Sequence, residues 1–400
     1  MSKLRVHAPG RINIIGEHTD YTGGLVMPAA IRQGITFNVE RNGAGVLHLF
    51  ARDLEERAEV SLPVTGKTGR TWVDYLVGIA FQFQELGHAV PGLTIDFGGD
   101  LPQGAGVSSS AALEGGMAFL LNEITGAGLS RPELAKLCQR SSNTFMGIPS
   151  GIMDQFASLN GVAEGPILLD CHTLDFTPVN ASLPGYSWVL INSNVTHDLS
   201  EGAYHDRVRE CATALAAIQE KFPRVDRLSA ASPAQVSAVA DQLNPTVLRR
   251  AEFVTRENQR VRDMAKVLGA DAGARSIDEE QSEEANGVSA KALAVGDLLN
   301  ATHAGLRDDY EVSCAEIDFL QRWATETFAG EVTGSRIMGG GFGGCTLNLV
   351  RAGDLERLRA EVVPAYEAAF GITATMIEVE IGAGARVVGI LGRGLPARPV

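Results

Sequence analysis

The sequence predicts an α+β protein with two domains. Its 400 residues exceed the ~100–200 residues of a typical single domain. The first hundred residues are rich in β-branched and aromatic side chains with partial alternation, which is typical of strands. After residue 200 apolar residues recur at helical spacing, and strand-like segments return near the end. The most natural boundary lies near residues 180–200, and we expect a ligand site where the domains meet.

The expected elements follow in order along the chain. From residue 108 to about residue 160 the pattern is helical, and Ser130 and Glu133 have the spacing of a capping box. The acidic segment 278–284 is expected to be a solvated loop or the start of a helix. Strands are expected at 34–41, 46–53, 93–97, 166–170, 186–192, 345–350 and 373–381, and further helices at 71–88, 202–220, 246–268, 289–304, 313–327 and 355–370.

Composition and charge exclude several classes of protein. The formal net charge of -14 disfavours nucleic acid or an anionic membrane as the main partner, because both require a basic surface. No run of ~18 apolar residues occurs, so no membrane span is expected. The five cysteines are scattered without a CxxC pair, which argues against a disulfide scaffold or a structural zinc site. We expect a cytoplasmic protein, a monomer or weak homo-oligomer.

The first chemical motif lies near the N-terminus and combines polar groups with four glycines. Its polar residues are Arg11, Glu17, His18, Asp20 and Tyr21. The glycines bend the backbone and allow it to approach a ligand. Carboxylates and an imidazole this close together suit a polyhydroxylated ligand, since each hydroxyl both donates and accepts a hydrogen bond. An ordinary charged turn is the alternative, but such turns rarely combine so many functional groups.

The second motif, at residues 102–114, follows an expected strand and opens an expected helix. Glycines with successive backbone amides at a helix N-terminus are typical of an anion-binding loop. Three serines add hydroxyls for phosphate and Mg²⁺. A serine-rich helix cap is the alternative interpretation of the same pattern.

Three other patterns are excluded by their context. Gly66-Lys67-Thr68 does not close a P-loop, because Ser61 occupies the place of the opening glycine. The glycines of residues 338–344 match the dinucleotide-binding spacing, but they precede a strand instead of opening a helix. Asp96-Phe97-Gly98 lacks the His-Arg-Asp loop of a protein kinase. The glycine-rich segment instead predicts backbone packed closely against a ligand or another loop.

Together these segments resemble the galactokinase branch of the GHMP small-molecule kinases. GRINIIGEHTDYTGG (10–24) is similar to the galactokinase signature, GAGVSSSAALE (104–114) to the nucleotide loop and GGGFGGCT (339–346) to the third motif. The similarity also covers GIPSGIMDQFAS, LLDC, HDLSEGAYHDRVREC, EFVTRENQRV and HAGLRDDYEVSC, and thus most of the chain. It implies a ribosomal S5-like, sugar- and ATP-binding N-terminal domain over 1–185. A ferredoxin-like α+β C-terminal domain would cover 186–400, with the active site in the cleft between them.

The resemblance also implies site residues and their roles. Asp154 would face the sugar O1 and either accept its proton or position the hydroxyl, and Arg11 would stabilise the transition state. Ser110 would bind Mg²⁺. The sugar-binding residues would be Glu17, His18, Thr19, Asp20, Gly151 and Tyr204. ATP would lie along Gly104, Ala105, Gly106, Val107, Ser108, Ser109 and Ser110.

One position departs from the pattern of this family. Twelve residues before Asp154, family members place a glutamate that binds Mg²⁺, whereas this chain has Ser142. A neutral hydroxyl is a weaker partner for Mg²⁺ than a carboxylate. We expect activity with a high Mg²⁺ requirement. The change Ser142→Glu should lower that requirement unless another acid, with Glu114 as the candidate, already fills the role.

Three functions stay open from the sequence. The leading hypothesis is ATP-dependent phosphorylation of D-galactose to galactose 1-phosphate and ADP. The second is a kinase for another sugar, N-acetylgalactosamine or a uronic acid, and the third is a weakly catalytic sensor of sugar and ATP. Ser142 favours the sensor, whereas Arg11, Asp154 and the intact serine-rich loop favour a kinase.

Overall fold

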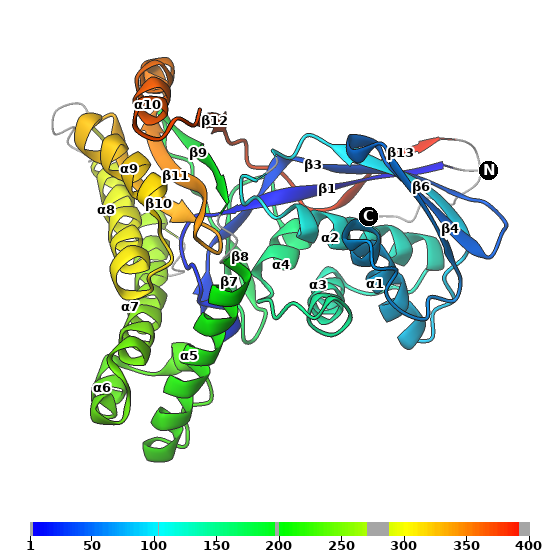
Figure 1. Cartoon of the computed structure of the whole chain (residues 1–400), viewed down its shortest axis with the longest axis horizontal. Helices are drawn as coiled ribbons and strands as arrows, with labels where there is room; N and C mark the ends of the chain where they lie inside the picture. Colours follow the sequence, from blue (N-terminus) through cyan, green and yellow to red (C-terminus); the bar gives the residue numbers. More distant parts are fainter. Residues whose placement is uncertain (1–2, 103, 197–199, 270–287, 392–400) are drawn as a thin grey trace.

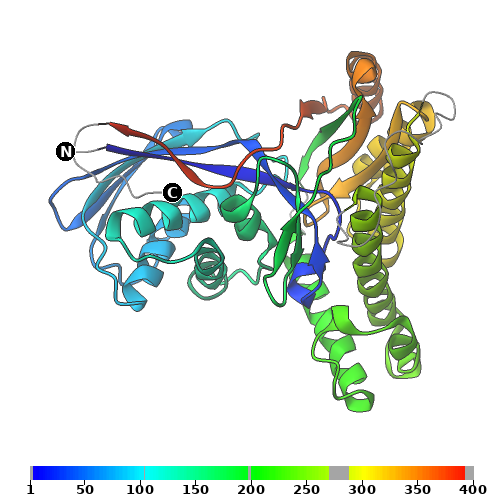
Figure 2. The same ribbon diagram turned by 180° about the vertical axis from the view of Figure 1, so that it is seen from behind.

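The computed structural model describes residues 3–102, 104–196, 200–269 and 288–391 (Figure 1). These residues form a six-stranded sheet, a four-stranded sheet and a small three-stranded sheet. Figure 2 shows from behind that the six-stranded sheet and the long C-terminal helices lie at opposite ends of the molecule. The mixed helix-and-sheet class predicted from the sequence is confirmed.

The six-stranded sheet has the order β13-β1-β3-β6-β4-β5. Neighbours pair antiparallel except β4 and β6, which pair parallel. Helices α2 and α4 contact β1 and β3, and all four N-terminal helices cover one face of the sheet (Figure 1). The strands are β1 (Lys3–Asn13), β3 (Pro28–Arg41), β4 (Val46–Ala51), β5 (Glu56–Ser61), β6 (Leu93–Gly99) and β13 (Arg386–Leu391). The helices are α1 (Thr71–Glu85), α2 (Ser109–Thr125), α3 (Arg131–Arg140) and α4 (Met153–Asn160).

Strand β1 was not predicted from the sequence, because Pro9 and Gly10 lie inside it and both weaken a strand pattern. The strand forms because β3 and β13 pair with it on either side. Its register against β3 shifts between Pro9 and Arg11. A Cβ on Gly10 would lie 2.8 Å from the carbonyl oxygen of Val107. The glycine therefore allows the second motif to lie directly against the strand.

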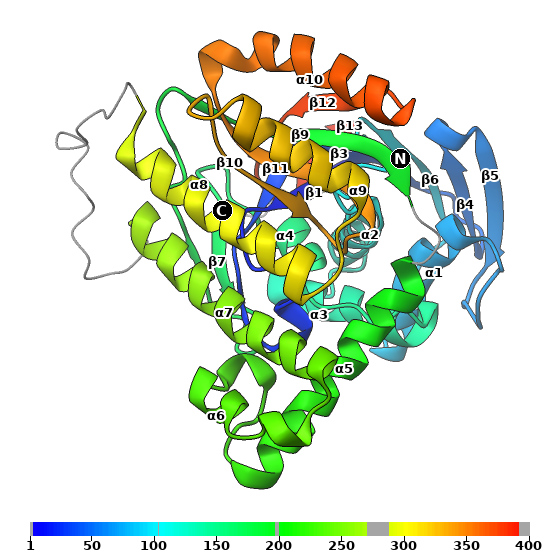
Figure 3. The ribbon, with the colours of Figure 1, turned by 60° about the vertical axis from the view of Figure 1, so that its left-hand side comes forward.

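The four-stranded sheet has the order β10-β11-β9-β12 and is antiparallel throughout. Helices α7 and α8 lie side by side in Figure 3 and contact each other, and α8 also contacts β10. The small sheet consists of β2 (Leu25–Val26), β7 (Ile167–Asp170) and β8 (Phe176–Pro178). The four strands are β9 (Tyr186–Thr196), β10 (Val332–Met338), β11 (Gly343–Arg351) and β12 (Thr375–Glu378). The helices are α5 (Ser200–Lys221), α6 (Pro233–Ser237), α7 (Pro245–Leu268), α8 (Ala290–Ala304), α9 (Ala315–Arg322) and α10 (Leu355–Phe370).

Several smaller expectations can be compared with the structure. The capping box is confirmed, since the Ser130 side chain and the Glu133 side chain each accept the other residue's backbone N–H. The segment 278–284 lies outside the described residues. Within the described parts of the chain, no helix combines the length and apolarity needed to span a membrane. The domain division after residue 185 stays a prediction. Strand β13 lies after this boundary in the sequence and pairs with β1, which lies before it.

Candidate active site

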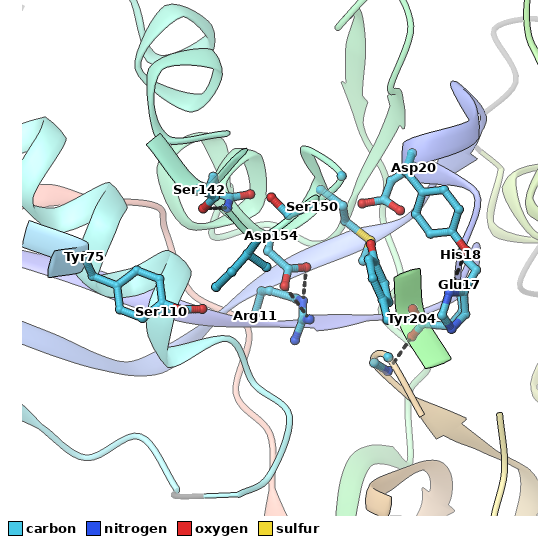
Figure 4. A pocket seen from close by; sticks show the side chains of 17 residues that line it. Arg11, Glu17, His18, Asp20, Tyr75, Ser110, Ser142, Ser150, Asp154 and Tyr204 are labelled. Carbon is cyan, nitrogen blue, oxygen red and sulfur yellow. Dashed lines mark hydrogen bonds and ion pairs between the residues drawn. The ribbon is translucent and has the colours of Figure 1, made fainter. Parts of the chain in front are cut away.

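The three motifs meet at one cavity, which Figure 4 shows from close by. Strand β1 brings the first motif to it, the start of α2 the second, and the loop after β10 the third. Asp154 and Tyr204 come from α4 and α5. In Figure 4, Ser110 and Asp20 lie on opposite sides of Asp154. The predicted residues that line the cavity are Arg11, Glu17, His18, Asp20, Ser110, Ser142, Gly151, Asp154 and Tyr204.

Arg11 and Asp154 form a two-pronged ion pair at the centre of the cavity. Arg11 Nε donates to Asp154 Oδ1 at 2.7 Å, and Nη2 donates to Oδ2 at 2.8 Å. The arginine side chain is 5% exposed and the aspartate side chain 31%, so the carboxylate is the part that faces the cavity. Such bidentate pairs fix orientation as well as charge. The structure thus holds a carboxylate in one defined position beside the space for a ligand.

The second motif is tied to this ion pair. Arg11 Nη1 donates to the carbonyl oxygen of Gly106 at 2.5 Å, and the Arg11 backbone N–H donates to Val107 at 3.0 Å. Gly104, Gly106 and Ser108 all have positive φ angles, of 68°, 64° and 59°. The Ser108 hydroxyl donates to Asp154 and makes no cap on α2. For Ser108, the interpretation as an ordinary helix cap is therefore wrong.

Glu17 links the first motif to the third. Its Oε1 atom accepts from Arg336 Nη1 and from the backbone N–H of Gly339, each at 3.0 Å. Arg336 is fully buried and also donates to the backbone carbonyl oxygens of Asn13, Ile14 and Ile337. Glu17 itself is only 2% exposed. One of its oxygens belongs to this buried ion pair, and the residue also lines the cavity.

Asp20 lies against the backbone of Gly151. A Cβ at Gly151 would come within 1.7 Å of Asp20 Oδ2, so only glycine leaves room for this carboxyl group. Burial, followed by the nearby negative charge of Asp154, raises the pKa of Asp20 to about 7. A hydroxylated ligand that donates hydrogen bonds to Asp20 would stabilise its charged form.

Some predicted residues do not reach the cavity. Thr19 is fully buried, and its hydroxyl donates to the carbonyl oxygens of Gly16 and Leu25, so its place is inside the turn. The side chains of Ala105 and Val107 pack in the apolar core that includes Ile12 and Met338. In this loop, backbone groups and serine hydroxyls are what a nucleotide could contact.

Ser142 lies in a single π-helical turn that extends α3 over Ser141–Met146. Its hydroxyl contacts both carboxylate oxygens of Glu114, at 2.7 and 2.9 Å, and Gln155 Nε2 donates to Glu114 at 3.2 Å. Glu114 is fully buried, and burial raises its pKa to about 7. The sequence singled out both residues, but their contact could not be predicted because they lie 28 residues apart on different helices.

A second hollow adjoins the first and shares Tyr75 and Ser110 with it. Trp72, on the first turn of α1, also lines it and donates from Nε1 to Glu56 at 2.9 Å. Both aromatic residues are half-buried, whereas most of α1 is buried. The expected helix at 71–88 gave no indication that these two side chains lie beside Ser109 and Ser110.

Residues 74–162 match the family model described as GHMP kinases N terminal domain. The loop at the start of α2 lies within this match, so residues 74–162 have the sequence of a GHMP kinase N-terminal domain. Residues 2–41 match the model described as Galactokinase galactose-binding signature. A galactokinase from Roseiflexus sp. is 35% identical over 93% of this chain and 89% of its own length. One from Thermotoga petrophila is 34% identical over 96% of this chain and 100% of its own length. The chain therefore belongs to the galactokinase family.

The fold agrees with this assignment. The crystal structure of Lactococcus lactis galactokinase complexed with galactose superimposes with a TM-score of 0.87 and 32% sequence identity. The match covers 96% of this chain and 95% of that one. The GHMP kinase fold predicted from the sequence is confirmed.

Proposed function

We propose that the chain transfers the γ-phosphoryl group of ATP to the anomeric hydroxyl of D-galactose, giving galactose 1-phosphate and ADP. The bond from O1 to phosphorus forms, the bond from phosphorus to the β,γ-bridging oxygen breaks, and O1 loses its proton. The observation that carries the proposal is the Arg11–Asp154 pair, which stands between Ser110 on one side and Asp20 and His18 on the other (Figure 4). A sugar held by the first motif and a nucleotide held by the second would meet there.

The residues at the cavity have distinct tasks in this proposal. Asp20, His18, Glu17 and Tyr204 bind the sugar hydroxyls, and Gly151 leaves room for the Asp20 carboxyl group. Asp154 orients the O1 hydroxyl toward the γ-phosphorus, and it either accepts the O1 proton or only positions the hydroxyl. The Arg11 guanidinium offsets negative charge that develops on the transferred group.

ATP fits the second hollow and the adjoining loop. Trp72 and Tyr75 offer flat aromatic surface for a base, while the amides and hydroxyls of Ser109 and Ser110 lie at the start of α2. Among the residues that the structure describes, no three His, Cys, Asp or Glu side chains are grouped to hold a metal. Mg²⁺ would thus be held mainly by ATP phosphates with Ser110, where it would neutralise phosphate charge.

The direct test is a coupled assay of ADP release. Millimolar galactose with ATP and Mg²⁺ should stimulate turnover strongly over the sugar-free rate, because the cavity combines sugar-binding groups with the Arg11–Asp154 pair. Glucose, N-acetylgalactosamine and galacturonic acid serve as comparison substrates. Faster turnover with one of these than with galactose would overturn the choice of substrate, and sugar-independent ATP binding without turnover would favour a sensor.

The contact between Ser142 and Glu114 changes the expectation for Mg²⁺. Ser142 lines the cavity, and the Glu114 carboxylate lies directly behind it, hydrogen-bonded to the Ser142 hydroxyl. Glu114→Gln should therefore raise the free Mg²⁺ concentration for half-maximal rate several-fold, and Ser142→Glu should not lower it. A Mg²⁺ titration at fixed ATP and galactose measures both effects.

The matched control for this titration is Glu123→Gln, which removes an exposed carboxylate from the same helix. Its Mg²⁺ curve should superimpose on that of the unchanged protein. If Ser142→Glu lowers the requirement and Glu114→Gln leaves it unchanged, Glu114 does not act on the metal. Cytoplasmic location and a monomeric or weakly oligomeric state stay predictions.

A further inference from the structure

A continuous row of hydrogen-bonding side chains runs from the sugar side of the cavity into the protein. His18 Nδ1 lies 3.0 Å from the Tyr21 hydroxyl, which lies 2.7 Å from the Tyr310 hydroxyl. That hydroxyl in turn lies 3.2 Å from Cys211 Sγ. We call Tyr21, Tyr310 and Cys211 the hydroxyl chain. The catalytic proposal above uses His18 but gives these three residues no task.

The inner end of the hydroxyl chain is held rigidly. Tyr310 is fully buried, and its carbonyl oxygen accepts from Arg207 Nε at 2.7 Å. The next residue, Glu311, is fixed by Arg207 through its carbonyl oxygen and by Arg250 through its carboxylate. The ring of Phe253 packs 4.5 Å from the Tyr310 ring, centroid to centroid. Helices α5 and α7 therefore determine where the Tyr310 hydroxyl points.

Burial also fixes the number of hydrogens along this row. It raises the pKa of Tyr21 and of Tyr310 well above the ordinary value and that of Cys211 to about 12. Burial, with the charge of Arg207 as the next cause, lowers the pKa of His18 to about 3. At neutral pH each member of the hydroxyl chain therefore carries one hydrogen, and the imidazole is neutral with a hydrogen on one nitrogen only.

Two directions satisfy the three contacts, and each leaves one hydrogen over. In the first, the Cys211 thiol donates to Tyr310, Tyr310 donates to Tyr21, and Tyr21 donates to His18 Nδ1, which leaves the imidazole hydrogen on Nε2. In the opposite direction the thiol hydrogen would have no acceptor among the described residues. A hydrogen left on Nε2 lies at the cavity, where a ligand can accept it, whereas one left on the buried thiol cannot be accepted there. The first direction is therefore favoured.

We propose that Tyr310 and Cys211 are positioning residues that, through Tyr21, hold His18 in the tautomer with a bare Nδ1 and a hydrogen on Nε2. His18 Nε2 is buried at the cavity and makes no hydrogen bond with the part of the protein that the structure describes. It is thus an unsatisfied donor, and a sugar oxygen would accept its hydrogen. The site would then reject an analogue that lacks this oxygen, because the buried donor would stay unpaired. The choice of a sugar as the ligand rests on the proposed function.

The tautomer can be observed without any turnover. Long-range ¹⁵N–¹H correlation spectra of the ligand-free protein, with His18→Gln for assignment, should show Nδ1 as the unprotonated nitrogen of His18. In Tyr21→Phe this nitrogen loses its donor, and the spectrum should shift toward a mixture of tautomers. A hydrogen on Nδ1 in the unchanged protein would overturn the proposal. Because this measurement needs no substrate, it is independent of whether galactose is phosphorylated.

Kinetics supply the second readout. Tyr21→Phe should raise the KM for galactose about tenfold and change kcat much less, since a directed hydrogen bond contributes on the order of a factor of ten. Tyr310→Phe should raise it less, because Tyr21 can still donate to His18. The control is Tyr366→Phe, which removes a hydroxyl from a side chain as fully buried as that of Tyr310; this hydroxyl donates to the carbonyl oxygen of Ser193 at 3.0 Å. Equal KM changes in Tyr366→Phe and Tyr21→Phe would reduce the hydroxyl chain to a packing role.

Discussion

Replacing Asp154 with asparagine should lower kcat by about 10²–10⁴-fold and leave the KM for galactose nearly unchanged. The amide keeps the size of the side chain but cannot take a proton from O1. It also carries only one acceptor oxygen, whereas Arg11 and Ser108 together donate to both oxygens of the carboxylate. Steady-state kinetics of ADP release at saturating ATP measure the effect.

The control for this change is Asp96→Asn, which breaks an arginine–aspartate pair with Arg52 away from the cavity. Its kcat should stay close to that of the unchanged protein. Arg11→Ala should also lower kcat, and the double variant should fall by less than the product of the single effects, because the two residues are in contact. A kcat within threefold of the unchanged protein for Asp154→Asn would remove Asp154 from the chemistry.

Replacing Arg336 with methionine should destabilise the protein by about 3–5 kcal/mol. The change leaves Glu17 as a buried charge with only the Gly339 amide as a partner among its described contacts. It also removes the donors for the carbonyl oxygens of Asn13 and Ile14. A shift of the denaturant unfolding midpoint to lower concentration measures the loss.

Two further variants separate charge from packing at this site. Adding Glu17→Gln to Arg336→Met should recover part of the stability, because the unpaired charge is removed together with its partner. Arg351→Met breaks a pair with Asp354 in which the arginine is 39% exposed, and should cost less than about 1 kcal/mol. Similar losses of stability for Arg351→Met and Arg336→Met would show that burial does not increase the contribution of the Glu17–Arg336 pair to stability.

The sequence predicted most elements whose pattern is local. The strands at 34–41 and 93–97 and the helix at 355–370 show clear periodicity, and the structure has them in place. Strand β1 was missed because its pairing with β3 and β13 outweighs the weak propensity of Pro9 and Gly10. A pairing partner such as β13, which lies hundreds of residues away, leaves no mark on a local pattern.

The same limit applies to the site. Residues of the first two motifs were found because glycines and functional groups cluster within a few positions. The partner of Glu17, Arg336, lies 319 residues away, so its contact could not be read from spacing. Trp72 was not predicted as a site residue because an aromatic residue in an expected helix is usually part of the apolar core. In the structure it is half-buried and lies beside Ser109, which distinguishes it from a core residue.

The pairing of β13 with β1 has a consequence for how the protein is made. Lys3 in β1 pairs with Leu391 in β13, so one edge of β1 has no partner until the ribosome has added the residues that follow 385. At ~5–20 residues per second this takes roughly 20–80 s. During that time the nascent chain presents an open strand edge, which is a template for pairing with other chains. The nascent chain is therefore open to such pairing throughout the interval between the synthesis of β1 and that of β13, and a truncation upstream of Arg386 would make that exposure permanent.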